Sequence, residues 1–145
     1  MYLEVKEMKK SYGEGDSFNQ VLKGISTGVE KGQMCVIQGT SGSGKSTFLN
    51  CIGGLDTLDS GSIIVDGTQI VGMKPDKLSD YRRDNLGFIF QFYNLIPNLT
   101  IRENIQVCEY LSKNPLDLEE LLETLGLTQH QNKFPSQLSG GQQQR

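Results

Sequence analysis

The sequence predicts an α/β fold in which strands and a phosphate-binding loop come first and helices follow. Three observations carry this prediction. The segment Gly39–Thr47 fits the pattern G-x-x-x-x-G-K-[ST] and stands between an apolar run and an apolar helix start. The chain before it alternates between apolar and polar residues, which is typical of half-buried strands. Beyond Pro97, apolar residues recur at the spacing of amphipathic helices.

Two alternating runs precede Gly39–Thr47, which we call the P-loop, and each predicts a strand with one buried face. They cover residues 2–8 and 21–29, with a polar, glycine-containing loop between them. The apolar run Met34–Ile37 predicts a buried strand that leads into the P-loop. A helix is expected from Ser46 until the glycines that begin at Gly53. Its apolar positions are Phe48, Leu49 and Ile52.

Further along, residues 62–70 predict two short strands joined by a turn at Asp66 and Gly67. A polar helix is expected over residues 76–83, and a second buried strand over residues 86–90. The pattern of apolar residues then changes from strand to helix.

In the helical part, Thr100 and Glu103 have the spacing of a capping box at the start of a helix. The apolar stripe of that helix would hold Ile101, Ile105 and Cys108. A second helix is expected over residues 116–125, ended by Gly126. We therefore expect one domain with two parts: residues 1–92 as the β-region and P-loop core, and residues 93–145 as a helical subdomain.

The P-loop predicts binding of a nucleoside triphosphate. Glycines let the backbone fold around a phosphate chain, while successive N–H groups and the helix start present positive charge to it. Lys45 would bridge the β- and γ-phosphates, and the Ser46 hydroxyl would bind Mg²⁺. The alternative is a Gly/Ser-rich linker, which would not lie between a buried strand and an apolar helix start. The expected binding residues are Gly39, Thr40, Ser41, Gly42, Ser43, Gly44, Lys45, Ser46 and Thr47.

Composition restricts the other possible functions. The 145 residues carry a net charge of −3 and no basic stripe with interleaved aromatics, so a nucleic-acid ligand is not expected. The three cysteines are widely spaced and form neither a disulfide framework nor a metal knuckle. The N-terminal residues do not look like a signal peptide, and no apolar run is long enough to span a bilayer. Direct membrane insertion is therefore not expected, and any membrane role would depend on a partner.

A second glycine motif lies near the end of the sequence, at Ser139-Gly140-Gly141-Gln142. A Ser-Gly-Gly turn that opens a polar helix presents a group of backbone N–H donors to anionic oxygens. Taken alone, Ser-Gly-Gly is a common loop sequence.

Together with the P-loop, this motif closely resembles the signature sequence of ATP-binding cassette (ABC) proteins. Tyr12 lies where that family places an adenine-stacking ring, and Gln91 is similar to the family's Q-loop glutamine. The stretches Phe90–Pro97 and Gly53–Asp56 resemble the subgroup that serves lipoprotein-release, macrolide-export and cell-division complexes. Read without the family, Tyr12 is an edge-strand aromatic and Gln91 a strand-end amide. His130, in a polar run, is expected to be a solvated surface residue.

The resemblance implies a P-loop NTPase core of ABC type with an N-terminal antiparallel β-subdomain and a partial α-helical subdomain. This core would bind ATP and Mg²⁺, with Ser46 and Gln91 as metal contacts and Lys45 and Gln91 in catalytic positions. Two ATP-binding subunits would pair head to tail, so that Ser139, Gly140, Gly141 and Gln142 close over the partner's ATP. An integral membrane subunit would dock near residues 93–100. The expected location is cytoplasmic, at the inner face of the membrane and peripheral to it.

The resemblance also implies that about the last third of the family's domain is absent from these residues, including its Mg²⁺-binding Asp, catalytic Glu and switch His. The 145-residue polypeptide is therefore expected to bind ATP without hydrolysing it at a meaningful rate. Two alternatives remain at this point: a non-hydrolysing nucleotide-binding or interaction module, and a different P-loop phosphotransferase.

Overall fold

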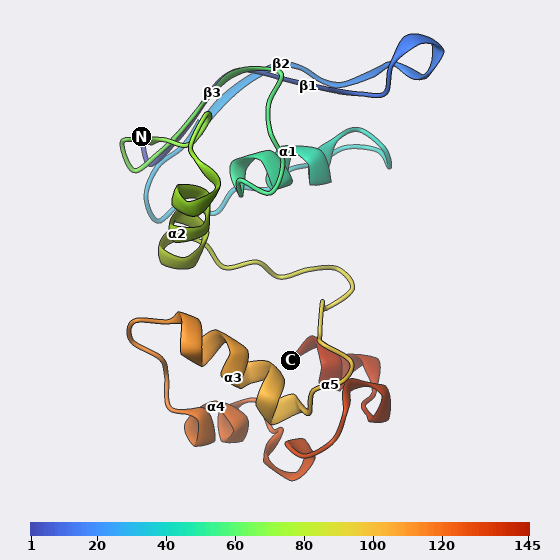
Figure 1. The fold of residues 1–145 in the computed structure, drawn as a ribbon, viewed down its shortest axis with the longest axis vertical. Coiled ribbons are helices and arrows are strands. Elements are labelled where there is room, and N and C mark those ends of the chain that lie inside the picture. Colours follow the sequence, from blue (N-terminus) through green and yellow to red (C-terminus); the bar gives the residue numbers. More distant parts are fainter. The chain divides into compact units, whose positions relative to one another are not determined.

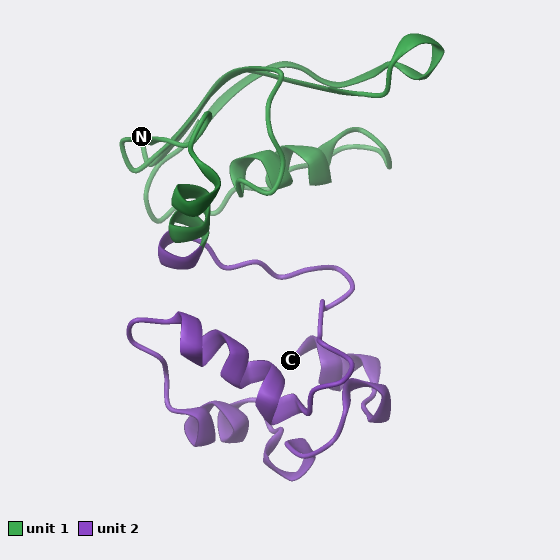
Figure 2. Ribbon diagram, viewed as in Figure 1, with its two compact units in different colours: residues 1–82 green, residues 83–145 purple.

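The computed structural model describes residues 1–145, and the chain divides into two units. We call residues 1–82 the sheet unit and residues 83–145 the helical unit (Figure 2). The first holds the strands and the P-loop, and the second holds most of the helices and the Ser139 motif (Figure 1).

The sheet unit is built on four strands, β1 (Leu3–Tyr12), β2 (Asn19–Val29), β3 (Ser60–Val65) and β4 (Thr68–Gln69). Their spatial order is β2-β1-β3-β4, and every neighbouring pair is antiparallel. Both N-terminal strands were predicted, and each extends beyond its alternating run. The antiparallel β-region expected at the start of the chain is therefore present.

A bulge in β1 interrupts the alternation that the sequence predicts. Glu7 adopts a φ of 47°, and the register with β2 shifts between Val5 and Met8. Val5 and Met8 are consequently both buried although three positions separate them, which period two does not allow. Gly61 lies against this bulge, where a Cβ atom would stand 2.5 Å from the Glu7 carbonyl oxygen. Only glycine fits there without moving the backbone.

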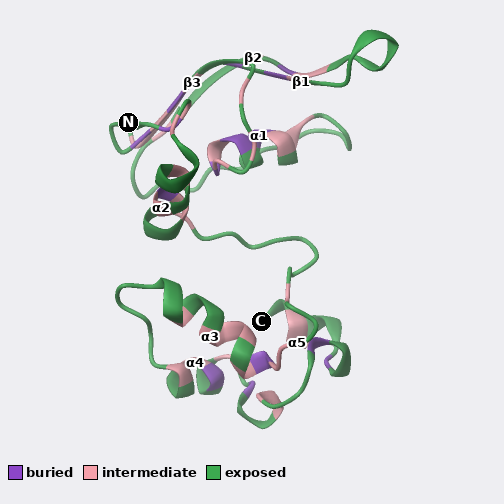
Figure 3. Ribbon diagram, viewed as in Figure 1, coloured by how far each residue is buried: buried purple, intermediate pink, exposed green.

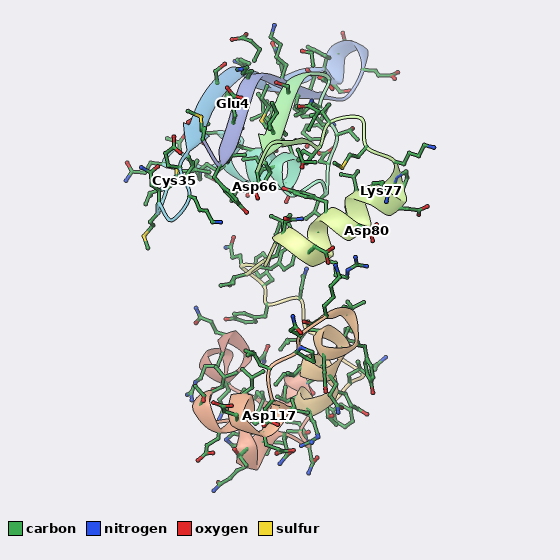
Figure 4. The ribbon with its side chains drawn as sticks, turned by 90° about the vertical axis from the view of Figure 1, so that its left-hand side faces the viewer. Glu4, Cys35, Asp66, Lys77, Asp80 and Asp117 are labelled. Atoms are coloured by element: carbon green, nitrogen blue, oxygen red, sulfur yellow. The ribbon has the colours of Figure 1, made fainter.

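The turn predicted between β3 and β4 is confirmed. Asp66 and Gly67 have φ values of 46° and 75°, the pair of positive values that a type I′ turn requires. Figure 4 labels Asp66 at this turn.

Two helices complete the sheet unit: α1 (Lys45–Ile52) and α2 (Pro75–Asn85), the second of which crosses the boundary at residue 82. In Figure 1, α1 lies beneath the sheet, and its buried residues are Phe48 and Cys51 rather than Leu49. The Tyr81 hydroxyl donates to the Ile52 carbonyl at 3.1 Å, which ties α2 to the end of α1.

Two predicted strands are wrong. Residues 34–37 and 86–90 carry no strand, and Met34 and Ile89 are 95% and 98% exposed. A strand exists only where a neighbour supplies ladder hydrogen bonds, and neither run joins the four-stranded sheet. Apolar composition identifies a segment that can be buried in a sheet, but it does not supply the partner.

The helical unit contains α3 (Ile101–Leu111), α4 (Leu118–Thr124) and α5 (Gly140–Gln144), with 3₁₀ turns at Thr128–His130 and Pro135–Gln137. The Thr100 cap is confirmed: its side chain accepts from the Glu103 N–H, and the Glu103 carboxylate accepts from the Thr100 N–H at 2.7 Å. Four buried residues form the core, coloured purple in Figure 3. They are Ile101, Leu122, Leu127 and Leu138. Of the stripe predicted for α3, Ile101 is buried and Cys108 is exposed.

Candidate functional site

The P-loop turns into α1 through a left-handed glycine. Gly44 is the N-cap of α1 with a φ of 92°, and a Cβ atom at this position would stand 2.8 Å from Val21 Cγ1 on β2. Gly42 also has a positive φ, of 78°, but a Cβ there would meet nothing within 4 Å. The loop is thus packed tightly against β2 at Gly44 and open at Gly42.

Lys45 is the first residue of α1, and its ammonium group folds back onto the loop. Its Nζ donates to the carbonyl oxygens of Gly39 and Thr40 at 2.9 and 2.7 Å. The first hydrogen bond of α1 runs from the Phe48 N–H to the Gly44 carbonyl, at 2.8 Å. The N–H groups of Lys45 to Thr47 come before it, and the N–H groups of a first helical turn have no partner within the helix. These donors and the ammonium are the groups that a phosphate chain needs.

A phosphate chain fits this loop, because the space that it encloses would be filled by a Cβ atom at Gly39, which would stand 2.5 Å from Ser43 Oγ. The free amides of the helix start also lie beside the Lys45 ammonium. The structure holds no cluster of three or more His, Cys, Asp or Glu side chains that could bind a metal ion. A magnesium ion at this site would therefore take most of its ligands from the phosphates and water, and the Ser46 hydroxyl is the ligand that the sheet unit would supply.

Tyr12 stands at the end of β1, in the same unit as the P-loop, and is 43% exposed. Its hydroxyl donates to Asp56 Oδ2 at 2.5 Å. The hydrogen bond to Asp56 and, secondly, burial raise the pKa of Tyr12, while a side-chain hydrogen bond from Thr47 acts in the opposite direction. Asp56 in turn bonds through its N–H to the Asn50 carbonyl of α1 at 3.3 Å. The structure thus connects the predicted ring, through Asp56, to the helix that follows the P-loop.

The Ser139 motif forms the start of a helix, as predicted. Ser139 is the N-cap of α5, with Gly140 and Gly141 in its first turn, and its Oγ accepts from the Gln142 N–H at 3.3 Å. In return, Gln142 Oε1 accepts from the Ser139 N–H at 2.9 Å, which completes a capping box.

His130 is not the solvated surface residue that the sequence suggested. Its Nε2 lies 3.0 Å from Gln142 Nε2, and its Nδ1 is buried without a partner. The 3₁₀ turn at Thr128–His130 places the ring against Gln142 of α5, and the polar sequence around His130 does not predict this contact.

Gln91 lies in the helical unit, where it lines a cavity of about 760 Å³ together with Gln142. Phe88 and Phe90 also line it and stack on one another with ring centroids 5.4 Å apart. The structure therefore brings Gln91 and the Ser139 motif to one cavity. The P-loop belongs to the sheet unit, so the contact predicted between Gln91 and a metal at Ser46 stays a prediction.

Sequence reasoning missed two residues beside Tyr12. Lys10 and Asp56 contact one another and the tyrosine, and Asp56 was noted only as the last residue of the Gly53–Asp56 stretch. Lys10 and Asp56 are far apart in the sequence, so no local sequence pattern predicts that they form an ion pair.

In the described chain, no helix has both the length and the apolar character that crossing a bilayer requires.

Comparison with known proteins gives three consistent results. The model of the family described as "ABC transporter" matches residues 22–145. The macrolide export ATP-binding/permease protein MacB of Mannheimia succiniciproducens is 47% identical over 148 residues, which cover 99% of this chain and 23% of that protein. The MG065 homolog of Mycoplasma pneumoniae, named as an ABC transporter ATP-binding protein, is 45% identical over 99% of this chain and 31% of its own length.

Among solved structures, the ATP-binding cassette MJ0796, described as a dimer in a post-hydrolysis state with ADP and phosphate, superposes with a TM-score of 0.87 at 35% identity. The match covers 97% of this chain and 65% of the cassette. The chain thus spans about a quarter to a third of the curated relatives and about two thirds of one solved cassette. The α/β class, the cassette type of P-loop core and the resemblance to macrolide-export proteins are confirmed.

Proposed function

Because this chain belongs to the ABC transporter family as an ATP-binding domain, we propose that it binds ATP with Mg²⁺ and serves as the ATP-binding part of a membrane transporter. One observation supports this most directly. The sheet unit holds a left-handed glycine packed on β2, a lysine at the start of α1 and an exposed aromatic ring connected to α1 through Asp56. These are a phosphate cradle, its cation and a surface for a base.

Each group has a role in this proposal. The backbone of the P-loop holds the phosphates, and Lys45 leaves the Gly39 and Thr40 carbonyls to bind the β- and γ-phosphate oxygens. Ser46 and Gln91 would contact Mg²⁺, which would neutralise phosphate charge when bound. Tyr12 stacks on the adenine, a contact worth about 1–3 kcal/mol for a base on an aromatic ring.

Assembly with a second subunit and a membrane partner is part of the same proposal. The solved relative is described as dimeric, and MacB is named as an ATP-binding/permease protein. Ser139, Gly140, Gly141 and Gln142 would close over the ATP of a second ATP-binding subunit, and a membrane subunit would dock near residues 93–100 of the helical subdomain (93–145). The protein would then lie at the cytoplasmic face of the membrane, attached through that subunit.

We further propose that the 145-residue polypeptide binds ATP but hydrolyses it at a negligible rate. In-line attack by water needs a carboxylate to position the water and an acidic ligand to hold the metal. The family's Mg²⁺-binding Asp and catalytic Glu are, by the resemblance, outside these residues, and the match covers 65% of the solved cassette. Phosphate release above background that Lys45→Ala abolishes would contradict this proposal.

The binding proposal is tested by titrating the polypeptide with ATP and Mg²⁺ in a calorimeter. Lys45→Ala should weaken binding at least about tenfold, since a charged contact to a phosphate contributes about 1.5–3 kcal/mol. Lys77→Ala is the matched control, because Lys77 is an exposed lysine on α2 of the same unit (Figure 4). Equal affinities for all three proteins, or no binding, would overturn the proposal.

A further inference from the structure

Three side chains of the sheet unit form a cluster outside the P-loop, which we call the Lys10–Tyr12–Asp56 cluster. The Asp56 carboxylate uses both oxygens: Oδ2 accepts from the Tyr12 hydroxyl at 2.5 Å, and Oδ1 accepts from Lys10 Nζ at 2.9 Å. The Lys10 ammonium also stands over the Tyr12 ring, 5.0 Å from its centroid. Each of the three side chains therefore contacts the other two.

The backbone around the cluster fixes where each member lies. Lys10 and Tyr12 are two positions apart on β1, with a register shift after Lys10, and the Lys10 ammonium lies 5.0 Å from the centre of the Tyr12 ring. Asp56 follows α1, and its N–H bonds to the Asn50 carbonyl at 3.3 Å, which connects it to that helix. The Thr57 N–H donates to Asp56 Oδ1 at 2.7 Å and sets the orientation of the carboxylate.

Lys10 is buried, whereas Tyr12 is partly exposed to solvent. Lys10 is only 8% exposed, and a cation so deeply covered needs an acidic partner. Tyr12 is 43% exposed although its hydroxyl is bonded to Asp56. The tyrosine is therefore held at its tip while part of its ring remains open. Since Lys10 covers one face, the ring can offer a flat ligand only the other face.

The charges of the cluster agree with this geometry. The hydrogen bond to Asp56 raises the pKa of Lys10 more than burial lowers it. Burial raises the pKa of Asp56, but the hydrogen bonds from Tyr12 and Lys10 together outweigh it and lower that pKa overall. Lys10 thus stays cationic, Asp56 anionic and Tyr12 a neutral donor across the neutral range.

We propose that Asp56 is a positioning residue for the nucleotide base: it holds the Tyr12 hydroxyl so that the ring meets the adenine in one preset orientation, with Lys10 backing its other face. This inference rests on the proposed function, in which Tyr12 stacks on the base. Asp56 itself does not contact the nucleotide. By holding the Tyr12 ring in place before ATP binds, Asp56 reduces the entropy that the ring loses on binding.

The expected effect is specific to ligands that carry a base. Ordering one side chain on binding costs about 2- to 10-fold in affinity, and Asp56→Ala should weaken binding of ATP with Mg²⁺ by that factor. Inorganic tripolyphosphate, which has the phosphates and no base, should bind Asp56→Ala and the unchanged protein equally. Asp76→Ala is the matched control, since Asp76 is an exposed acid on α2 of the same unit and outside the cluster.

Tyr12→Phe provides a second variant that leaves the Lys10–Asp56 ion pair intact and keeps the ring. It should weaken ATP binding as Asp56→Ala does, and the double variant should show no further loss, because both changes remove the same hydrogen bond. Equal losses for ATP and tripolyphosphate in Asp56→Ala, or additive losses in the double variant, would overturn the proposal. If Lys45→Ala changes neither ligand's affinity, the proposed function itself has failed instead.

Discussion

Replacing Gly44 by alanine should destabilise the protein more than the same change at Gly42, and the difference measures how tightly the P-loop packs on β2. Both glycines have positive φ, 92° and 78°, where a Cβ atom costs about 1–2 kcal/mol. Only at Gly44 would that Cβ meet other atoms: Val21 Cγ1 at 2.8 Å and Leu22 Cδ2 at 3.1 Å. Overpacking of this kind costs about 1–3 kcal/mol more.

The free energy of unfolding is therefore expected to fall by about 1–2 kcal/mol for Gly42→Ala and by about 2–5 kcal/mol for Gly44→Ala. Urea denaturation without nucleotide, followed by circular dichroism, measures both values. Adding Val21→Ala should recover about 1 kcal/mol or more of the Gly44→Ala loss, because the nearest clashing atom is then gone. Equal losses at the two glycines, with no recovery in the double variant, would refute the packing described for the loop.

Three further outcomes are expected. Thr100→Ala should cost about 1 kcal/mol of stability in urea denaturation through loss of the cap on α3. Hydrogen bonds from the Thr100 N–H and hydroxyl lower the pKa of Glu103 in the folded protein. The stability that these bonds contribute is therefore fully present above the unfolded carboxyl pKa of about 4.3, and it disappears as the pH falls through the lower pKa of the folded state. A cap contribution that stays constant from pH 6 to pH 2 would contradict this. Leu122→Ala should cost about 2–5 kcal/mol because its side chain is fully buried, whereas Leu116→Ala, at an exposed position, should stay within about 0.5 kcal/mol. Burial raises the pKa of Cys51 to about 11, so at pH 8 a thiol reagent should modify the exposed Cys35 and Cys108 (Figure 4 labels Cys35) long before Cys51, as peptide mass spectrometry would show.

Features set by short-range chemistry could be predicted from the sequence. The Asp66-Gly67 turn, the Thr100–Glu103 capping box and the Ser139 cap each depend on residues within three positions of one another. Their geometry follows from the residue types alone, and the structure reproduces them.

Features that depend on distant partners could not be predicted. Residues 34–37 and 86–90 have the composition of buried strands, but a strand also requires a neighbour, and the runs are exposed. The bulge at Glu7 is set by the approach of Gly61 from another strand. The hydrogen bond between Tyr12 and Asp56 joins residues 44 positions apart, so no local sequence pattern predicts it.

The most direct test of the account is to locate bound ATP by NMR, using the protein labelled with ¹⁵N and with ¹³C in its tyrosine rings. Addition of ATP and Mg²⁺ should shift the amide signals of Gly42, Gly44 and Lys45 and, among the five tyrosines, the ring signals of Tyr12. Lys45→Ala should abolish these shifts at the same ATP concentration. Shifts confined to other residues, or P-loop signals that ATP leaves unchanged, would contradict the claim that this loop and this ring form the nucleotide site.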